Sequence, residues 1–576
     1  MKISKTLFKE LIRCPSYYGF NKLYFERKKV NLSNKSFSEL KYYLDYMIDE
    51  DTKEDKIKKP LKLYEQEQFE ETEKVLIKYA NKILKTEFKA ESLDKQKQLF
   101  YRDSDGNSFY TKTDAYQETK DEIIVLEVKA KSTTDFLDIK TFAFEKNESI
   151  LYLPNKEDFL SEKQAEKQEK FIIKSGFDPI HKVGRYLLDG LYTYWLVSKN
   201  NPRGKKITFY LALLNHEYYL DKSKATKDNP YPYLKGSGEI VVLLDLSRAY
   251  KKYFYLIENY VEHVQRLIRE NKFIEPVIAS RCKRNNDNAC EFGSVCFGEL
   301  ESLPGSAIFF EGEKKYEDII RGKKTMDKYS DEELIKDIHR IQKRCFIKNE
   351  QHVDREMIKA WIEDLKYPVY YLDFESFNAP LPRFDGEKPY TQSVFQFSLH
   401  TEHTKTSLKD IDDNHFSFLA PDFEDYRKEC AEALIREIDL KKGGTIIAYN
   451  ASFEKTRIEE LAKLFPQYEK KLLKIRNHII DLKDALVKSI SGIKKAYFYD
   501  NKLEGSYSIK KVLPVFAPEL SYKDLEIQEG MMAQEAYYSF QKLDEEDLEE
   551  VRKNLEEYCK LDTWSMVLIV HALSKP

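Results

Sequence analysis

Two acidic side chains interrupt an apolar, aromatic run in the second half of the chain. Residues 370–376 read Tyr-Tyr-Leu-Asp-Phe-Glu-Ser, so Asp373 and Glu375 are two positions apart. In a β-strand such residues point to the same face, and both carboxylates would project together from a sheet. Adjacent anions need a proton or a cation to persist, and oxygen ligands suit a hard divalent metal ion. The alternative is a half-exposed strand whose acids face water.

Three further polar side chains follow in the same part of the chain. Residues 444–449 read as a buried strand, and the helix that opens directly after it carries Glu454 in its first turn, near the sheet edge. Residues 544–573 read as one helix, on which Tyr558 and Asp562 share a face because they are four apart. The ordinary alternatives are an acid favoured by the helix dipole and a solvated polar face.

A second acidic group lies in the N-terminal part of the chain. Residues 108–117 and 122–130 alternate like two strands of a hairpin. With the turn at residues 120–121, Asp114 stands opposite Glu127, and Lys129 falls on the same face as Glu127.

An Asp, a Glu and a Lys on one face are suited to metal-assisted phosphodiester hydrolysis. The carboxylates would hold Mg²⁺ or Mn²⁺, which polarises the phosphate and lowers the pKa of an attacking water. The lysine would orient that water or offset developing negative charge. The alternative is a salt bridge on a surface hairpin, but the apolar residues 123–126 favour a buried strand.

Four cysteines form a third group of possible ligands. Cys282, Cys290 and Cys296 are clustered in a loop-like segment, and Cys14 is the natural candidate for a fourth ligand. No knuckle with two to four intervening residues is present, so the spacing suits an iron–sulfur cluster better than structural zinc. The alternative is a set of free thiols.

The length, charge and apolar content of the whole chain limit these interpretations. Its 576 residues predict three or four domains, and its formal net charge of −3 gives no global field for nucleic acid. No apolar stretch of 18 residues exists, and the N-terminus lacks the apolar core of a signal peptide. We therefore expect a cytoplasmic protein without a membrane partner and without a disulfide framework.

The N-terminal pattern resembles a known group of nucleases. Asp114…Glu127-Val128-Lys129 resembles the PD-(D/E)XK nuclease signature, and with the cysteines the first 300 residues resemble iron–sulfur RecB-like nucleases, including CRISPR-associated RecB-like nucleases and the nuclease domain of AddB. The resemblance makes Asp114 and Glu127 metal ligands and Lys129 the catalytic lysine. It also implies a [4Fe–4S] cluster on four cysteines: Cys14, Cys282, Cys290 and Cys296.

This sequence departs from that family at two places. The upstream helix offers no His but several glutamates, among them Glu67, Glu70 and Glu71. The downstream helix, residues 181–196, shows no clear Gln in the family's Gln–Tyr motif. It offers four other polar residues: Arg185, Tyr186, Asp189 and Tyr192.

The C-terminal pattern resembles a second group. Asp-x-Glu on a strand, Asn-x-x-Phe-acid, and Tyr-x-x-x-Asp on a late helix resemble the DnaQ-like 3′–5′ exonucleases of the DEDDy type, which implies an RNase H-like fold. The resemblance assigns Tyr558 to the attacking water and four acids to two metal ions: Asp373, Glu375, Glu454 and Asp562. Glu454 stands where that family has Asp. Residues 505–511 resemble a loop and helix start that lines the substrate groove.

Together these patterns predict an α/β multidomain protein. We expect a RecB-like, restriction-endonuclease-like domain at residues 1–300, a helical connector at 301–366 and a DnaQ-like domain at 367–576. The expected function is metal-dependent hydrolysis of phosphodiester bonds in DNA, exonucleolytic at single-stranded ends, in repair, recombination or defence. The alternatives are an RNA exonuclease, or a nucleic-acid end-binding protein with one or both sites inactive.

Overall fold

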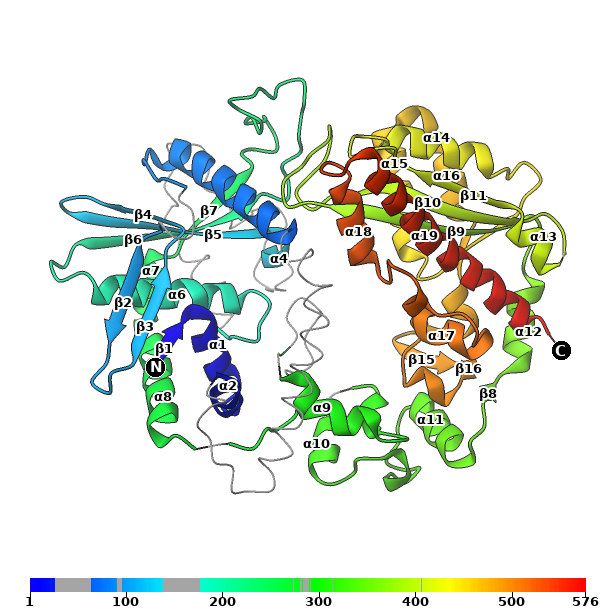
Figure 1. Cartoon of the computed structure of the whole chain (residues 1–576), viewed down its shortest axis with the longest axis horizontal. Helices are drawn as coiled ribbons and strands as arrows, with labels where there is room; N and C mark the ends of the chain where they lie inside the picture. The colour runs from blue at the N-terminus through cyan, green and yellow to red at the C-terminus, as the bar shows by residue number, and fades with distance from the viewer. Residues whose placement is uncertain are drawn as a thin grey trace. The chain divides into compact units, whose positions relative to one another are not determined.

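The computed structural model shows a mixed α/β multidomain protein. It divides into two compact units, Met1–Val277 with Ala379–Thr391, and Ile278–Asn378 with Gln392–Pro576. Both units are drawn in Figure 1. The described residues are 1–25, 64–90, 96–137, 177–272, 274–279, 282, 290, 292–312, 314–405 and 407–575.

A four-stranded sheet forms the centre of the first unit, in the order β4-β5-β6-β7. Its strands are β4 (Ala115–Glu118), β5 (Glu122–Ser132), β6 (Lys206–Leu214) and β7 (Val241–Asp245). β5 and β6 are parallel, and the other two pairs are antiparallel. β4 and β5 form the predicted hairpin in the predicted register, because Ala115 pairs with Leu126 and Glu118 with Ile123.

The prediction of one continuous strand over residues 108–117 is wrong. The chain forms β3 (Ser108–Lys112), leaves it at Thr113 and Asp114, and only then enters β4. β3 belongs to a separate sheet, in the order β1-β3-β2, with β1 (Lys2–Ser4) and β2 (Gln98–Arg102). The break coincides with a side-chain hydrogen bond, since Oδ2 of Asp114 accepts the backbone N–H of Val128 at 2.6 Å. Such bonds compete with the sheet ladder.

Helices complete the first unit. Residues 64–84 are helical, as the apolar spacing predicts, whereas the start of that predicted helical layer, residues 36–63, lies outside the described residues. The N-terminal helices end and begin around the predicted break at Cys14-Pro15. The bounds are α1 (Lys5–Arg13), α2 (Tyr17–Phe25), α4 (Thr134–Leu137), α6 (Gly184–Lys199), α7 (Ser247–Lys252) and α8 (Phe254–Glu270).

The second unit contains a five-stranded sheet in the order β11-β10-β9-β12-β13. The strands are β9 (Val369–Asn378), β10 (Gln392–Glu402), β11 (His415–Leu419), β12 (Thr445–Ala448) and β13 (Ile479–Asp481). β9, β10 and β11 are antiparallel neighbours, whereas β12 runs parallel to both β9 and β13. β9 therefore lies at the point where the sheet changes from antiparallel to parallel pairing.

Helices cover both faces of this sheet. The bounds are α13 (Leu408–Asp412), α14 (Arg427–Glu437), α15 (Ser452–Leu464), α16 (Glu469–Asn477), α17 (Ile509–Phe516), α18 (Gly530–Ser539) and α19 (Glu545–Leu573). Tyr370 and Leu372 of β9 pack with α14, α15 and α16, whereas Val369 and Tyr371 pack with α17 and α19. Because side chains alternate along a strand, Asp373 and Glu375 continue the set that faces α19.

The predicted helical connector is largely helical and belongs to the second unit. Its residues contribute to a small apolar cluster that includes Ile308, Phe310 and Met326. The helices here are α9 (Gly293–Ser302), η3 (Ala307–Phe309), α10 (Lys314–Ile320), η4 (Met326–Lys328), α11 (Asp337–Lys348) and α12 (Arg355–Glu363). The remaining elements of the unit are β8 (His352–Val353), η5 (Pro466–Tyr468), η6 (Leu482–Ala485), β14 (Val487–Ile490), β15 (Ile493–Ala496), β16 (Phe498–Tyr499), η7 (Asn501–Leu503) and η8 (Tyr522–Asp524).

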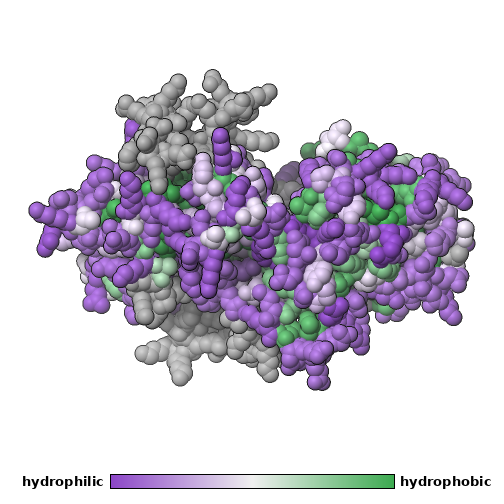
Figure 2. All heavy atoms as spheres, turned by 90° about the horizontal axis from the view of Figure 1, so that it is seen from above, coloured by the Kyte–Doolittle hydropathy of each residue, from purple (hydrophilic) through white to green (hydrophobic). Residues whose placement is uncertain are grey.

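Within the described part of the chain, no helix combines the length and apolarity that a membrane crossing requires. On the face drawn in Figure 2, hydrophilic residues predominate and hydrophobic residues form scattered small areas.

Candidate active sites

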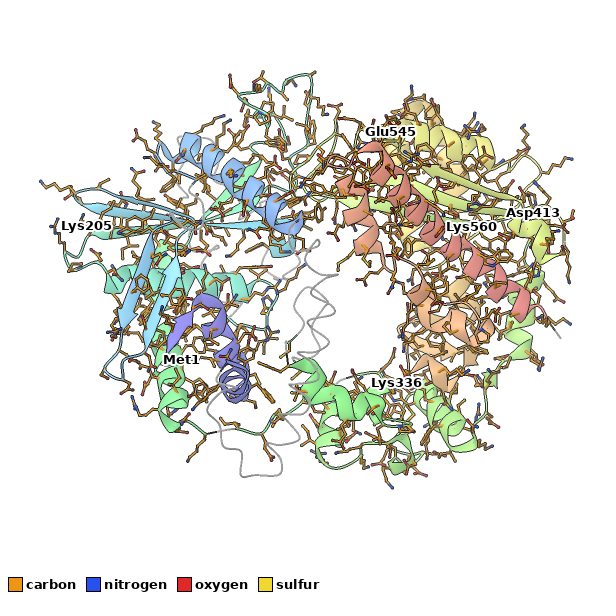
Figure 3. All side chains as sticks on the ribbon, viewed as in Figure 1. Met1, Lys205, Lys336, Asp413, Glu545 and Lys560 are labelled. Atoms are coloured by element: carbon orange, nitrogen blue, oxygen red, sulfur yellow. The ribbon has the colours of Figure 1, made fainter. Side chains whose placement is uncertain are left out.

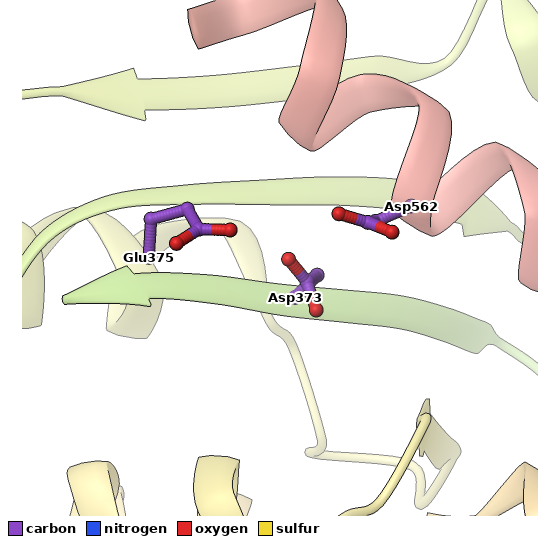
Figure 4. Close-up of side chains that lie close together, drawn as sticks. All are labelled: Asp373, Glu375 and Asp562. Atoms are coloured by element: carbon purple, nitrogen blue, oxygen red, sulfur yellow. The ribbon is translucent and has the colours of Figure 1, made fainter. Parts of the chain in front are cut away.

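Three carboxylates of the second unit converge between β9 and α19. β9 supplies Asp373 and Glu375, and α19 supplies Asp562 (Figure 4). One oxygen from each lies within 4.8 Å of those of the other two, a distance that one divalent cation could bridge. Among the described residues, no other group of three Asp, Glu, His or Cys side chains has that geometry. The predicted common face of Asp373 and Glu375 is confirmed.

The three carboxylates, which we call the acidic triad, are held at a cost in electrostatic energy. Glu375 is 9% exposed and Asp562 is 7% exposed. Burial, and then the charge of Asp562, raise the pKa of Asp373 and of Glu375 well above the usual range. Burial also raises the pKa of Asp562 to about 6. Carboxyl groups in this state retain protons unless a cation compensates their charge.

Glu454 lies near the triad but outside its 4.8 Å group. It is in the first turn of α15, as predicted, and is 2% exposed. Burial raises its pKa to about 8, and Asp562 is among the charges that contribute. Its Oε2 atom is buried and has no hydrogen-bond partner among the described residues. A buried carboxylate oxygen without a donor is suited to a cation.

Asp481 positions the start of α15 and was missed in the sequence. It is the last residue of β13, and its carboxylate accepts backbone N–H groups of Asn450 at 3.1 Å, Ala451 at 3.2 Å and Lys483 at 2.9 Å. Asn450 has a positive φ of 60° and lies in the turn between β12 and α15. The carboxylate thus stabilises the turn that delivers Glu454 to the sheet edge. An isolated Asp at a strand end gave no signal for this role.

Two tyrosines stand beside Asp562. The hydroxyl of Tyr522 donates to Oδ1 of Asp562 at 2.7 Å. Tyr558, one turn before Asp562 on α19, is 4% exposed, and its ring centroid lies 6.3 Å from that of Tyr522. Burial, followed by the charge of Asp562, raises the pKa of the Tyr558 hydroxyl, so this group stays protonated. The predicted Tyr558 is therefore at the triad, and Tyr522 is a second hydroxyl that no sequence motif indicated.

Lys510 is a basic group near the triad. Its positive charge opposes the effect of burial on the pKa of both Glu375 and Asp562. Its ammonium donates to the backbone carbonyl of Gln528 at 2.5 Å and lies 5.6 Å from the ring centroid of Tyr522. Lys510 belongs to the predicted loop and helix start at 505–511, since α17 begins at Ile509.

The first unit brings Asp114, Glu127 and Lys129 together. Asp114 immediately precedes β4 and stands opposite Glu127 in the hairpin register. The Lys129 ammonium lies 2.7 Å from Oε1 of Glu127, so these two share a face as predicted. Burial alone would raise the pKa of Glu127, but Lys129 and Lys5 outweigh it and hold that pKa at about 2. Burial and the charge of Glu127 raise the pKa of Asp114 to about 6.

Residues from three other segments complete this cluster. Lys5 of α1 forms an ion pair with Glu127, and Lys9 lies 2.8 Å from Oδ1 of Asp189. Asp189, one of the residues offered by the downstream helix, lies on α6 and is also 3.8 Å from Lys129. Glu73, from the helical residues 64–84, has a pKa raised to about 7 by burial and by Asp114. We call the group of Asp114, Glu127 and Lys129 with these four neighbours the hairpin site.

The four cysteines are divided between the units. Cys14 belongs to the first unit, and Cys282, Cys290 and Cys296 belong to the second. All four are half-buried, and Cys282 and Cys296 pack against the apolar cluster around Ile308. In the described residues, no three of these sulfur atoms form a ligand group within 4.8 Å. Residues 283–289 of the cysteine segment lie outside the described residues.

Comparisons with known proteins cover part of the chain. A family model described as "Domain of unknown function (DUF2779)" matches residues 370–508. This range contains Asp373, Glu375 and Glu454 and ends before Tyr558 and Asp562. No solved structure matches.

Two relatives come from mycoplasmas. "Uncharacterized protein UU173" of Ureaplasma parvum is 28% identical over 37% of this chain and 32% of its own length. "Uncharacterized protein MG366 homolog" of Mycoplasma pneumoniae is 29% identical over 38% of this chain and 33% of its own length. The chain therefore matches about a third of the length of these curated relatives.

Proposed function

We propose that this protein is a metal-dependent nuclease with two active sites, one at the acidic triad and one at the hairpin site. The observation that carries the proposal is the triad itself, in which three carboxylates from β9 and α19 place oxygens within 4.8 Å of one another. Such an array is unfavourable without a cation. It is also the ligand set that Mg²⁺ and Mn²⁺ favour.

The sheet around the triad supports a DnaQ-like exonuclease. In the sheet of an RNase H-like fold, the first three strands of the chain are antiparallel and the next two are parallel. The first strand lies in the middle of the sheet. The order β11-β10-β9-β12-β13 agrees with that arrangement, and the acids lie on β9, its first strand. Glu454 on α15 and Tyr558 and Asp562 on α19 occupy the elements in which that resemblance expects them.

The side chains have distinct roles in this proposal. Asp373, Glu375 and Asp562 would hold Mg²⁺ or Mn²⁺, with Glu454 beside them. The bound ions would polarise the phosphate and lower the pKa of the attacking water. Tyr558, which stays protonated, orients that water by hydrogen bonding.

Two further residues support these groups. Tyr522 fixes one oxygen of Asp562, so that the carboxylate keeps a single orientation. Lys510 provides a positive charge close to where the substrate phosphate would lie. Both roles can be tested without altering the carboxylates themselves.

The hairpin site supports a second, RecB-like centre. Asp114 and Glu127 face each other, and Lys129 lies within hydrogen-bonding distance of Glu127. Oε2 of Glu127 is buried without a hydrogen-bond partner among the described residues, and is available to a cation. Asp189 and Glu73 add carboxylates from α6 and from the helical residues 64–84, which compensates for the missing His and Gln of that family.

We propose DNA as the substrate, with single-stranded ends as the preferred form. The test is degradation of end-labelled DNA and RNA, each in single-stranded and double-stranded form, with Mn²⁺ and with excess EDTA. Asp373→Asn should abolish the activity that belongs to the triad, whereas Asp413→Asn, an exposed Asp of the same unit, should retain it (Figure 3). If the wild-type protein degrades only RNA, the proposal of DNA as the substrate is wrong. If it binds ends without degrading them, the result supports the alternative of an end-binding protein.

We also propose that the four cysteines hold a [4Fe–4S] cluster, on the basis of their order in the chain. Protein purified without oxygen should contain four irons per chain and a broad visible absorbance band. Cys290→Ser should remove both, while Cys345→Ser, at a buried cysteine outside the set, should keep both. Colourless, iron-free wild-type protein would overturn this proposal.

A further inference from the structure

A cavity of about 680 Å³ lies in the second unit, between α11 and the strand β15. Its lining comes mainly from residues 331–348, with His352 and Asp354 beyond α11 and Lys495 and Ala496 at the end of β15. None of these residues belongs to the triad. The volume is in the range of roughly 300–1,000 Å³ that is typical of ligand sites.

Basic residues predominate in the lining. Five lysines and arginines face three aspartates, and each aspartate already has a partner. Asp331 lies 2.6 Å from the ammonium of Lys343, and Asp337 lies 3.1 Å from the guanidinium of Arg340. Asp354 caps α12 by accepting the N–H of Met357 at 3.2 Å. The other basic residues are Arg344, Lys348 and Lys495.

These three remaining cations are incompletely compensated. Within the described part of the chain, neither Lys348 nor Lys495 has a carboxylate within ion-pair distance, and Arg344 reaches Glu350 only at 3.7 Å. Arg344 is instead held at the wall, since its guanidinium donates to Nδ1 of His352 at 2.9 Å. Nε2 of His352 lies 3.2 Å from the carbonyl oxygen of Ala496, which fixes the ring. The cavity therefore presents a guanidinium held by His352, with Glu350 at 3.7 Å, and two ammonium groups that no described carboxylate neutralises.

Packed elements connect this cavity to the triad. The side chain of Asn501 in η7 donates to the carbonyl of Cys345 in α11 at 3.1 Å. η7 contacts α17, which packs on α19, the helix of Asp562. Figure 1 shows β15 and α17 between α11 and α19. Lys510, near the start of α17, is a positive charge beside the triad.

We propose that this cavity binds the sugar-phosphate backbone of a single-stranded nucleic acid whose end lies at the triad. The inference rests on the proposed function and extends it by assigning a binding site remote from the carboxylates. The described lining residues include no Phe, Tyr or Trp, so the basic side chains are the main groups offered to a strand, and they suit its phosphates. Contacts to phosphates alone position a strand without reading its sequence. The site therefore binds without sequence preference and with strong salt dependence.

The test is a binding measurement that does not depend on hydrolysis. A fluorescein-labelled 20-nucleotide oligothymidylate is titrated with the full chain carrying Asp373→Asn and Asp114→Asn, in EDTA, and its anisotropy is followed. On this background, Lys348→Glu with Lys495→Glu should weaken binding roughly tenfold. It should also lower the slope of log affinity against log salt by about 0.7 for each phosphate that the protein no longer neutralises.

A matched pair of exposed lysines provides the control. Lys359→Glu with Lys463→Glu makes the same change of charge in the same unit, at side chains 74% and 72% exposed. This control should bind within twofold of the background protein. A second variant, Lys348→Gln with Lys495→Gln, should be intermediate, which guards against misfolding of the reversed variant.

Three outcomes would overturn the inference. One is equal affinity for the cavity and control variants, and another is an oligonucleotide affinity too weak to measure in the background protein. The third is displacement of the oligonucleotide by an equimolar 20-residue polyglutamate, which would make the ligand an acidic peptide. The degradation assay separately decides the proposed function, so the two proposals fail on different measurements.

Discussion

At the scale of single residues, the two candidate sites keep their carboxylates in different states. In the triad, every pKa is raised, because burial and mutual repulsion act in the same direction. In the hairpin site, two lysines keep Glu127 ionised while Asp114 holds its proton more tightly. In the triad the charge of Lys510 does not offset burial, whereas in the hairpin site two ammonium groups form ion pairs with Glu127.

This difference predicts how the stability of the metal-free protein depends on pH. The folded-state pKa of Glu454, about 8, exceeds the unfolded value of about 4.3. Its stabilising contribution is therefore complete below pH 4.3 and is lost as pH rises through 8. In EDTA, Tm should fall by several degrees more between pH 5 and pH 8 in wild type than in Glu454→Gln. Mg²⁺ at pH 8 should restore the wild-type Tm, and parallel curves in EDTA would contradict this account.

In the hairpin site, two similar substitutions should differ strongly in their cost to stability. Glu127→Gln leaves Lys5 and Lys129 without their buried partner, and should lower the free energy of unfolding by about 3 kcal/mol. Asp114→Asn, at pH 7.5, removes a carboxylate whose raised pKa makes its charge unfavourable, and should cost much less. Urea unfolding of both variants measures the difference. A larger loss in Asp114→Asn would show that the charges are assigned wrongly.

The choice of variants for activity measurements follows from these costs. Asp114→Asn is the suitable probe of the hairpin site, because lost activity in Glu127→Gln would be confounded by lost stability. For the triad, Asp373→Asn replaces a carboxyl that is already held protonated in the metal-free state. Such replacements remove a proposed metal ligand and should keep the fold.

At the scale of elements, local patterns predicted more than long-range contacts. The helix over residues 544–573, the register of the β4–β5 hairpin and the common face of Asp373 and Glu375 follow from spacing alone. The break at Asp114 did not, because it depends on a side-chain hydrogen bond to Val128 that alternation does not reveal.

Residues that act across the fold were also missed for a physical reason. Tyr522 meets Asp562 from 40 positions away, and Lys5 meets Glu127 from 122 positions away. Neither pair has a spacing that marks it in the sequence. Asp189 was named only as one of four polar residues on the helix compared with the family's Gln–Tyr helix, and its contacts with Lys9 and Lys129 were not predicted.

A glycine in the loop before α17 allows a prediction at this scale, with a second glycine as the matched control. Gly505 has φ +75°, and a Cβ there would lie 2.3 Å from the carbonyl oxygen of Phe309. Gly492 has φ +79° with open space around it. Gly492→Ala should therefore cost about 1 kcal/mol for backbone strain alone. Gly505→Ala should cost about 1–3 kcal/mol more for the clash.

Denaturant unfolding of the two alanine variants measures this difference. Because the 505–511 segment carries Lys510 to the triad, Gly505→Ala should also reduce the triad activity, whereas Gly492→Ala should not. Equal stabilities for the two variants would mean that Phe309 does not confine this loop.

At the scale of the whole molecule, each unit contains all the residues of one of the two proposed sites. The triad residues all belong to the second unit, and the hairpin-site residues all belong to the first. The two activities should therefore be separable by mutation. Asp373→Asn should leave the degradation due to the hairpin site, Asp114→Asn should leave that due to the triad, and the double variant should be inactive with Mn²⁺. Full loss of activity in either single variant would show instead that one site serves the whole protein.

Above all, we propose that the acidic triad is a divalent-metal centre. The most direct measurement is an anomalous-difference map from crystals of the protein soaked in Mn²⁺. We predict a peak within coordinating distance of Asp373, Glu375 and Asp562 in wild type, and its loss in Asp373→Asn but not in Asp413→Asn. Manganese peaks elsewhere in the wild-type crystal with none at the triad would contradict the claim.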